Sequence, residues 1–366
     1  MKFAHGLIIG KFYPPHRGHH HLIRTAASRC ERVTVVVCES EAESIPLADR
    51  VAWLRAEHAD TPWVRVAGAI DNHPVDYDDP ALWEVHCAIF REAVNGEAVD
   101  AVFTSEPYGA ELARRFDATE VLVDLDRSTV PASGSAVREN PLAQWDFLAA
   151  PVRAALAKRI VVLGAESTGT TTISRALAER YRARGGVFAA TEWVPEYGRE
   201  YTELKLDLLR ESEPDATVFD IRWEAADFAR VVERQNADED TAAGRGGPLL
   251  FCDTDSFATR VWEERYVGRM SAAVIAGSDR KPALYLLADH EDVPFVDDGM
   301  RDGEAIRPWM TGRFAELLEA AGQPWVRLTG SFDERMRAAE AACDALLDKG
   351  WSFAEPIKPR SSCVIE

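Results

Sequence analysis

The sequence lacks the features that mark secreted, membrane-spanning and nucleic-acid-binding proteins. Its 366 residues carry a formal net charge of −19, which argues against a broad binding surface for nucleic acid or anionic membranes. No run reaches the roughly 18–20 apolar residues that a membrane span requires. The N-terminal MKFAHGLIIG is too short and too weakly basic for a signal peptide. We therefore expect a cytoplasmic protein without nucleic-acid or membrane partners, and the composition is compatible with a homo-oligomer.

Paired cysteine motifs are also missing. The six cysteines form no C-x-x-C pair, so we interpret them as core thiols in a reducing compartment; they are Cys30, Cys38, Cys87, Cys252, Cys343 and Cys363. The last four residues, CVIE, superficially fit a prenylation box, but the acidic final residue favours a frayed tail.

Two glycine-containing loops stand out, each directly after a run of apolar residues. Residues 10–21 read GKFYPPHRGHHH and residues 164–172 read GAESTGTTT. A strand that leads into a glycine-containing turn and then a helix directs backbone N–H groups at phosphate. Two such units about 150 residues apart predict two nucleotide sites on two domains, and hence two phosphate chemistries.

Short β-type runs alternate with amphipathic helical patterns in both halves, which predicts an α/β fold with parallel, doubly wound sheets. We place one domain at residues 1–150, a second at 158–350 and a tail at 351–366. The domain junction is expected within residues 140–158, where helical spacing is broken at Pro151. In the second half, residues 219–237 predict a long helix, followed by an acidic surface stretch at 238–240.

The first loop places His16 and His19 three residues apart at the start of a predicted helix, so both face the same way. Gly18 lets the backbone approach a phosphate, and the helix terminus adds partial positive charge. This arrangement suits stabilisation of a triphosphate attacked at its α-phosphorus, a reaction that needs no protein nucleophile. A zinc site or a fortuitous cluster of histidines is the alternative interpretation.

A second element of the first half is SGSAVR, residues 133–138. Its hydroxyls, on Ser133 and Ser135, precede Arg138 at a predicted helix start, where they could hold the outer phosphates of ATP. Taken alone the segment would be an ordinary helix cap. Its place after a strand, about 115 residues beyond the histidine loop, favours the phosphate role.

The second loop has the Gly-x-x-x-x-Gly frame of a Walker A motif without its lysine. Thr170 occupies the lysine position, while Thr171 can still ligate Mg²⁺ through its hydroxyl. Losing one preorganised charge-stabilising donor costs on the order of 10²–10³ in rate. Two interpretations stay open: a degenerate nucleotide-binding loop, or a working kinase whose missing cation comes from another loop.

The first half resembles the nucleotidyltransferases of the HxGH superfamily, and specifically the nicotinamide mononucleotide (NMN) adenylyltransferase domain of the bifunctional NadR-type family. The matching stretches are GKFYPPHRGHHHLI, LADRVAWL, VFTSEPYGAEL, VLVDLDR and SGSAVRENPLAQWDFL. The resemblance implies that His16 and His19 contact ATP phosphates and that Arg138 acts on the β/γ side. Trp83 is a candidate for stacking on the nicotinamide ring, with a core tryptophan as the alternative. The expected ATP-binding residues of this half are Gly10, Lys11, Phe12, Gly18, Ser133 and Ser135.

The second half resembles the ribosylnicotinamide kinase domain of the same family, a P-loop kinase, through GAESTGTTT, PEYGREY, FCDTDSFAT, RYVG and VPFVDDGMR. If the strand before them continues, Asp253 and Asp255 point the same way, Asp253 toward the metal and Asp255 as a substrate contact or base. Glu196 is a further catalytic candidate. The other expected substrate-side residues are Tyr197, Arg199, Asp298 and Arg301. The expected ATP-binding residues are Gly164, Glu166, Ser167, Thr168, Gly169, Thr170, Thr171 and Thr172.

The resemblance implies an enzyme of NAD salvage. The second domain would phosphorylate nicotinamide riboside with ATP and Mg²⁺, and the first would join the resulting NMN to AMP from a second ATP, releasing pyrophosphate and NAD. Two other hypotheses are an adenylyltransferase with a degenerate kinase domain, and a non-catalytic NAD or ATP sensor. Family members can carry an N-terminal helix-turn-helix domain; the first catalytic strand lies within the first ten residues here, so we expect no direct DNA regulation.

Overall fold

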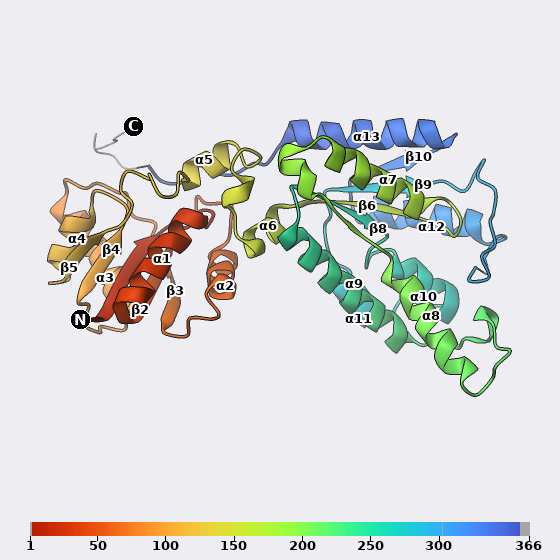
Figure 1. Cartoon of the computed structure of the whole chain (residues 1–366), viewed down its shortest axis with the longest axis horizontal. Helices are drawn as coiled ribbons and strands as arrows, with labels where there is room; N and C mark the ends of the chain where they lie inside the picture. The colour runs from red at the N-terminus through yellow and green to blue at the C-terminus, as the bar shows by residue number, and fades with distance from the viewer. Residues whose placement is uncertain (1, 302, 359–366) are drawn as a thin grey trace. The chain divides into compact units, whose positions relative to one another are not determined.

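The computed structural model describes residues 2–301 and 303–358, which form two compact units (Figure 1). The first unit contains residues up to Val152 together with the segment that begins at Trp351, and the second runs from Arg153 to Gly350. No helix among the described residues has both the length and the apolarity to cross a membrane.

The first unit is a five-stranded parallel sheet in the order β3-β2-β1-β4-β5. Its elements are β1 (Phe3–Gly10), α1 (Arg17–Arg29), β2 (Cys30–Glu39), α2 (Leu47–Glu57), β3 (Val64–Ile70), α3 (Pro80–Ala93), β4 (Ala101–Thr104), α4 (Gly109–Arg115), β5 (Thr119–Leu122), α5 (Gly134–Glu139) and the 3₁₀ turn η1 (Trp145–Phe147). Helix α6 (Ala150–Leu156) leads into the second unit. The order confirms the predicted doubly wound sheet.

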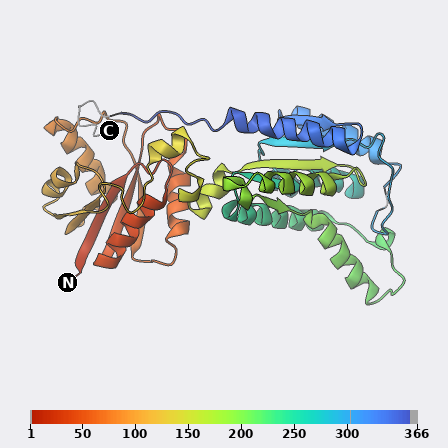
Figure 2. The ribbon, with the colours of Figure 1, turned by 45° about the horizontal axis from the view of Figure 1, so that its top comes forward.

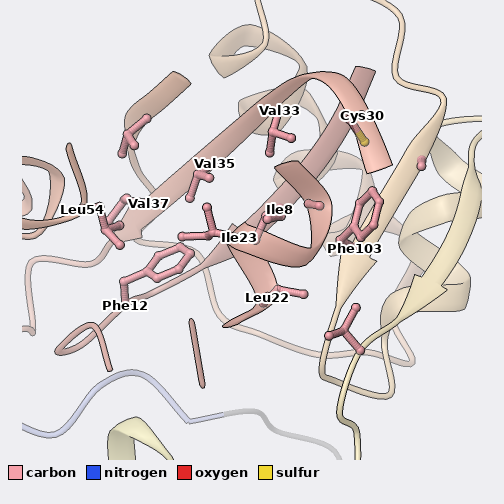
Figure 3. Packing of buried hydrophobic residues seen from close by; sticks show 14 of the residues in the cluster. Ile8, Phe12, Leu22, Ile23, Cys30, Val33, Val35, Val37, Leu54 and Phe103 are labelled. Carbon is pink, nitrogen blue, oxygen red and sulfur yellow. The ribbon is translucent and has the colours of Figure 1, made fainter. Parts of the chain in front are cut away.

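Alternate residues of the central strands fill two separate cores. Ile8 of β1 lies with Leu22 and Ile23 of α1 on one face of the sheet, as Figure 3 shows. Its neighbour Leu7 points to the other face, where it packs with residues of α3 and α4 such as Phe90. Strands buried on both faces explain the continuous apolar runs in the sequence. The sheet therefore carries helices on both sides, and its order changes direction at β1 and β4, where open α/β sheets bind ligands.

The second unit repeats this plan with strands in the order β10-β9-β6-β8-β7, all parallel. Its elements are β6 (Lys158–Gly164), α7 (Thr170–Ala183), η2 (Gly186–Ala190), β7 (Glu192–Val194), α8 (Tyr197–Arg210), η3 (Val218–Asp220), α9 (Ala225–Arg245), β8 (Leu249–Asp253), α10 (Thr259–Val267), α11 (Ala272–Gly277), β9 (Leu284–Ala288), α12 (Arg307–Ala320), β10 (Trp325–Leu328) and α13 (Phe332–Lys349). Residues of α7 and α13 share one core with β6, β8 and β9, and α9 packs on β7 and β8 (Figures 1 and 2).

The long helix predicted at residues 219–237 is displaced in the structure. Helix α9 begins at Ala225, after a capping box of Glu224 and Asp227, and continues through the acidic stretch to Arg245. The predicted acidic surface stretch at 238–240 lies within this helix, and only part of it is at the surface. Asp240 accepts hydrogen bonds from Arg159 (2.8 Å) and Arg280 (2.7 Å), and Glu239 is buried.

Candidate active sites in the two units

The histidine loop of the first unit joins β1 to α1, and its two motif histidines cap that helix. His16 is the N-cap residue, and its Nδ1 accepts a hydrogen bond from the Gly18 N–H (3.1 Å). His19 Nδ1 accepts from the His16 N–H (3.3 Å), and the two ring centroids lie 3.8 Å apart. Because both Nδ1 atoms are acceptors, the proton of each neutral ring sits on Nε2. The helix terminus thus presents two imidazole donors side by side.

Burial keeps these imidazoles neutral. It lowers the pKa of His16 to about 4, and it lowers that of His19 well below the usual value, with a further contribution from neighbouring positive charge that includes Arg127. Both rings line a cavity of about 870 Å³ at the carboxyl ends of β1 and β4. Neutral N–H donors and a helix N-terminus in a sheltered cavity suit a triphosphate whose charge develops during reaction.

His20 lies outside this cavity and has a different role. Its Nδ1 is 3.0 Å from Nε2 of His58, and burial lowers its pKa to about 3. Over residues 2–301 and 303–358, no group of three or more His, Cys, Asp or Glu side chains is arranged to hold a metal ion. His20 is thus paired with His58 and takes no part in the cap that His16 and His19 form on α1.

Arg138 approaches the same loop from α5. Its guanidinium donates to the backbone oxygen of Tyr13 (2.7 Å) and to Ser135 Oγ (3.2 Å), and it also lines the cavity. Ser133 caps α5 by accepting from the Ala136 N–H (3.1 Å), so the helix-cap and phosphate interpretations of this segment are compatible. A Cβ on Gly134 would lie 3.0 Å from the Tyr13 carbonyl oxygen, which explains the glycine between the two serines.

Lys11 and Phe12 are engaged within the protein. The Lys11 ammonium donates to Glu43 Oε1 (2.8 Å) and to the backbone oxygen of Ile357 (3.4 Å). Phe12 is buried in the core beneath the loop and packs on the His19 ring, with centroids 4.7 Å apart. Both residues, with Gly10 and Gly18, also border the cavity. Lys11 therefore acts here through an ion pair, and Phe12 supports the His19 ring.

Aromatic side chains also line the cavity. Trp83 belongs to the core and also borders the cavity; its indole N–H donates to the Tyr77 carbonyl (3.0 Å). Tyr77 and Tyr108 stack with their centroids 5.7 Å apart. Beside them, His86 Nδ1 bonds to Asp71, which raises the pKa of His86.

Sequence reasoning missed several of these cavity residues. Tyr108 and Arg127 lie within the matching stretches VFTSEPYGAEL and VLVDLDR, so the resemblance could have pointed to them. Tyr77, Asp71 and His86 lie in a stretch with no such signal, and only the fold brings them to the cavity.

The glycine frame of the second loop is built as a phosphate loop between β6 and α7. Gly169 has a positive φ of 89° at the N-cap of α7, and a Cβ on Gly164 would lie 2.6 Å from Thr168 Oγ1. Thr168 Oγ1 donates to the Ala165 carbonyl (2.8 Å), and Thr172 lies in the first turn of α7. Both glycines are therefore required by the backbone, and the loop keeps its form without the lysine.

Asp253, at the end of β8, faces this loop. Thr171 Oγ1 donates to its Oδ2 (2.5 Å), and hydrogen bonds from Thr171 and Thr170 oppose the rise in pKa that burial causes. The other oxygen, Oδ1, is buried and has no hydrogen-bond partner among the described residues. A carboxylate oxygen without a partner, beside the threonine hydroxyl of a P-loop, fits Mg²⁺.

Glu196 lies close enough to Asp253 for the two to affect each other. Burial, and next the charge of Asp253, raise the pKa of Glu196 to about 8, while Arg199 and Arg301 oppose the rise. Arg199 donates to Asp298 Oδ2 (2.8 Å), and Arg301 lies 3.6 Å from the same oxygen. The structure thus brings together Glu196, Arg199, Asp298 and Arg301, which lie about 100 residues apart in sequence.

The segment after β9 is attached to the tip of the phosphate loop at Ser167. Ser167 Oγ accepts from the Val296 N–H (2.8 Å) and from Arg301 (3.4 Å). Glu166, the preceding loop residue, lies 3.5 Å from Arg265. Ser167 thus connects the loop to a segment that carries an arginine.

Two further predicted site residues have hydrogen-bond partners within the protein. β8 ends at Asp253 and Thr254 has a positive φ of 60°, so Asp253 and Asp255 do not share a strand face. Asp255 is buried and accepts from the Tyr285 hydroxyl (2.8 Å) and the Ala258 N–H (3.0 Å). The expectation that Asp253 and Asp255 point the same way was therefore wrong; the Asp255 carboxylate supports the turn into α10, and its role toward substrate stays a prediction. The Tyr197 N–H is bonded to Gln235 (3.0 Å) at the start of α8.

Fold and site define a two-domain α/β protein with one nucleotidyltransferase-like unit and one P-loop unit. Residues 7–140 match the cytidylyltransferase-like family, and residues 159–335 match the AAA domain family. The trifunctional NAD biosynthesis/regulator protein NadR of Escherichia coli (strain K12) is 25% identical over 342 residues, which cover 88% of this chain and 78% of that protein. The protein of the same name from Salmonella typhimurium (strain LT2) is 24% identical, with coverages of 81% and 71%.

Two solved structures share the fold across both units. A NadR protein in complex with NR matches with a TM-score of 0.69 and 22% identity, covering 98% of this chain and 100% of that one. A NadR protein in complex with NAD and AMP-PNP matches with a TM-score of 0.66 and 22% identity, covering 94% and 97%. Over most of its length the chain is thus similar to the NadR proteins, and it has the nucleotidyltransferase-like and P-loop domain content that the sequence predicted.

Proposed function

We propose that the first unit transfers the adenylyl group of ATP to NMN, giving NAD and pyrophosphate. The observation that carries this assignment is the pair of neutral imidazoles, His16 and His19, at the N-terminus of α1 inside a cavity with an aromatic wall. The cavity lining offers both donors for phosphate and aromatic surface for a nicotinamide ring. The E. coli relative is named as an NAD biosynthesis protein, and a related structure holds NAD, which supports the assignment.

In this reaction an oxygen of the NMN phosphate attacks the α-phosphorus of ATP, and the bond to the bridging oxygen of pyrophosphate breaks. Charge builds on the non-bridging oxygens and on the leaving pyrophosphate. The Nε2–H groups of His16 and His19 and the helix N-terminus stabilise that charge, and Arg138 holds the outer phosphates. Because the rings are neutral, they donate hydrogen bonds without first losing or gaining a proton. Positioning and charge stabilisation supply the catalysis, and the protein forms no covalent bond to substrate.

The test of this site is the His19→Ala variant, assayed for NAD formation from NMN and ATP. We expect kcat to fall by on the order of 10²–10³, the cost of removing one preorganised donor. His21→Ala is the matched control, because His21 lies on the same helix and is not among the cavity-lining residues. Undiminished NAD formation by His19→Ala would contradict the site assignment.

For the second unit we propose ATP-dependent phosphorylation of nicotinamide riboside to NMN. Asp253 and Thr171 would hold Mg²⁺, which offsets the charge of the transferred phosphate. Glu196 is the candidate base for the substrate hydroxyl, because its carboxylate lies close to Asp253 and to the arginines Arg199 and Arg301. The hydroxyl oxygen attacks the γ-phosphorus, ADP leaves, and the hydroxyl proton passes to Glu196. The related structure in complex with NR supports this choice of substrate.

Arg301 is our candidate for the cation that replaces the P-loop lysine. Its guanidinium reaches Ser167 at the tip of the loop, and its charge acts on the Glu196 carboxylate. Arginine holds phosphate oxygens in a bidentate manner, so one such residue can substitute for an ammonium group. The buried Arg335 also donates to the loop, at the Thr168 carbonyl, but its donors are occupied by the carbonyls of Gly330, Asp289 and Glu291.

A second candidate function keeps the first unit as an enzyme and makes the second a domain that binds nucleotide without turnover. Thr170 at the lysine position is the observation in its favour. The partnerless Asp253 oxygen and the carboxylate–arginine cluster favour a working kinase. Incubating the protein with nicotinamide riboside, ATP and Mg²⁺ separates the two, because only a kinase forms NMN. Since both reactions use ATP, a cytoplasmic location remains our prediction.

A further inference from the structure

The chain returns to the first unit after its last helix. Residues 351–358, which we call the C-terminal strap, follow α13 and lie against the first unit (Figure 2). The Trp351 ring packs on Trp145, with centroids 6.1 Å apart, and the Phe353 ring meets Tyr13 edge-on at 6.4 Å. Two aromatic contacts hold the strap on the surface that carries the histidine loop.

Hydrogen bonds connect the strap to that loop through Ser44. The Tyr13 hydroxyl donates to the Ala354 carbonyl (3.0 Å), accepts from the Ser44 N–H (2.9 Å) and lies 2.7 Å from Ser44 Oγ. Ser44 Oγ in turn accepts from the Ala354 N–H (3.1 Å). Each donor among Tyr13, Ser44 and Ala354 has an acceptor, so this hydrogen-bond network fixes the position of the Tyr13 side chain. A further bond, from Lys11 Nζ to the Ile357 carbonyl (3.4 Å), fastens the strap nearer its end.

Tyr13, which the strap contacts, also binds Arg138. Tyr13 is buried, and its carbonyl accepts the 2.7 Å hydrogen bond from Arg138. The guanidinium groups of Arg138 and Arg50 lie over the Tyr13 ring at 5.0 and 5.4 Å from its centroid. A change in the position of Tyr13 would therefore change the position of Arg138.

The strap also forms part of the cavity wall. Phe353, Glu355, Pro356, Ile357 and Lys358 all border the 870 Å³ cavity that contains His16, His19 and Arg138. Removing the strap would open this side of the cavity to water, where hydrogen bonds and charges act more weakly on a bound phosphate.

We propose that residues 351–358 are a positioning element of the adenylyl-transfer site: they fix Tyr13, and through it Arg138, for binding of the ATP triphosphate. The proposal rests on the adenylyltransferase function assigned above. It makes the chemistry of the first unit depend on residues that follow the second unit in the chain. The effect falls on the KM for ATP, because Arg138 contacts the outer phosphates in the ground state as well as the transition state.

The first test compares a chain that ends at Gly350 with one that ends at Lys358. Ending at Gly350 should raise the KM for ATP in NAD formation from NMN about tenfold or more, which corresponds to about 1.4 kcal/mol. Phosphorylation of nicotinamide riboside should stay within about twofold. The chain ending at Lys358 should match the full chain, and a peptide of residues 351–358 added in trans should lower the KM of the shorter chain. An unchanged KM for ATP in the chain ending at Gly350 would overturn the proposal.

A pair of point variants covers the case in which the shortened chain does not fold. Phe353→Ala should raise the KM for ATP several-fold with kcat within about twofold, while Ser352→Ala, at an exposed position of the same strap, should change neither. Equal KM values for ATP in the two variants would contradict the proposed positioning role of the strap.

Hydrogen exchange separates failure of this proposal from failure of the assigned reaction. On addition of ATP, residues 10–19 should gain protection in the full chain and in Ser352→Ala, and gain less in Phe353→Ala. If the full chain makes no NAD from NMN, the assigned reaction is wrong, and the difference in protection still decides whether the strap orders the loop.

Discussion

Thr170 is the residue at which the chain departs most clearly from a known phosphate-binding motif. At the start of α7, the Thr170 hydroxyl lies near Asp253, where a Walker A motif has a lysine whose ammonium group reaches the β- and γ-phosphates. The loop around it is intact, and an arginine on another segment reaches its tip at Ser167. The missing charge is thus available from a different part of the fold.

This arrangement predicts opposite effects for two substitutions. Arg301→Ala should lower kcat for phosphorylation of nicotinamide riboside by on the order of 10²–10³, because it removes the cation that we propose in place of the P-loop lysine. Thr170→Lys should restore much of the rate in the Arg301→Ala background. Steady-state kinetics of NMN formation measures both, with Arg337→Ala, an exposed arginine of α13, as the control. If Arg301→Ala retains full activity, the cation comes from elsewhere.

At the same scale, residue types and spacing predicted many of the residues that lie together at the first cavity, and some of those that lie together near the second loop. His16, His19 and Arg138 lie together because a strand, a loop and a helix follow each other in a known order. The orientation of Asp255 was wrongly predicted because one residue with a positive φ, Thr254, ends the alternation of the strand. Such a local backbone change leaves no mark in the apolar pattern of the sequence.

Helix α1 shows how one element serves both binding and stability. Its N-terminus presents His16 and His19 to the cavity, while His20 points to His58 in the interior. Burial lowers the pKa of His20 to about 3 and that of His16 to about 4, with the positive charge of neighbours adding to both shifts. The folded unit therefore keeps these rings neutral at pH values where the unfolded chain binds protons.

The sign of the resulting pH dependence follows from linkage. Above pH 6.5, His16 and His20 are neutral in both the folded and the unfolded state, so they add nothing to the pH dependence. As the pH falls from 6.5 toward 4, these histidines bind protons in the unfolded chain but not in the folded unit. The free energy of unfolding of the first unit should therefore decrease over this range. Chemical denaturation at several pH values measures it, and the His20→Gln variant, which cannot titrate, should show a shallower slope. A slope equal to that of the unchanged chain would contradict the assigned burial effect.

Elements buried on both faces were the ones that the sequence predicted well. The expected alternation of strands and helices and the parallel sheets are both present, since apolar periodicity reports burial directly. Helix α9 was shifted because its acidic residues are neutralised by Arg159 and Arg280, partners that are distant in sequence. The strap was expected to be a tail, because eight residues without periodicity carry no signal of the surface they contact.

For the whole molecule, two parallel sheets with two phosphate loops predict that each unit can be disabled alone. With nicotinamide riboside and ATP as the starting materials, His19→Ala should accumulate NMN and form little NAD. Asp253→Ala should form neither, yet should make NAD from added NMN at the rate of the unchanged chain. Chromatography of the nucleotides distinguishes these patterns. Loss of NAD formation from NMN in Asp253→Ala would contradict the assignment of separate sites.

The central claim is that one chain catalyses two consecutive phosphate transfers, and parallel reactions from two starting points test it most directly. The purified protein, ATP and Mg²⁺ are incubated with nicotinamide riboside in one reaction and with NMN in the other, and NMN and NAD are followed by chromatography. We predict NAD from both, with NMN appearing before NAD in the first. NAD from NMN alone would contradict the kinase assignment of the second unit, and no NAD from either would contradict the account as a whole.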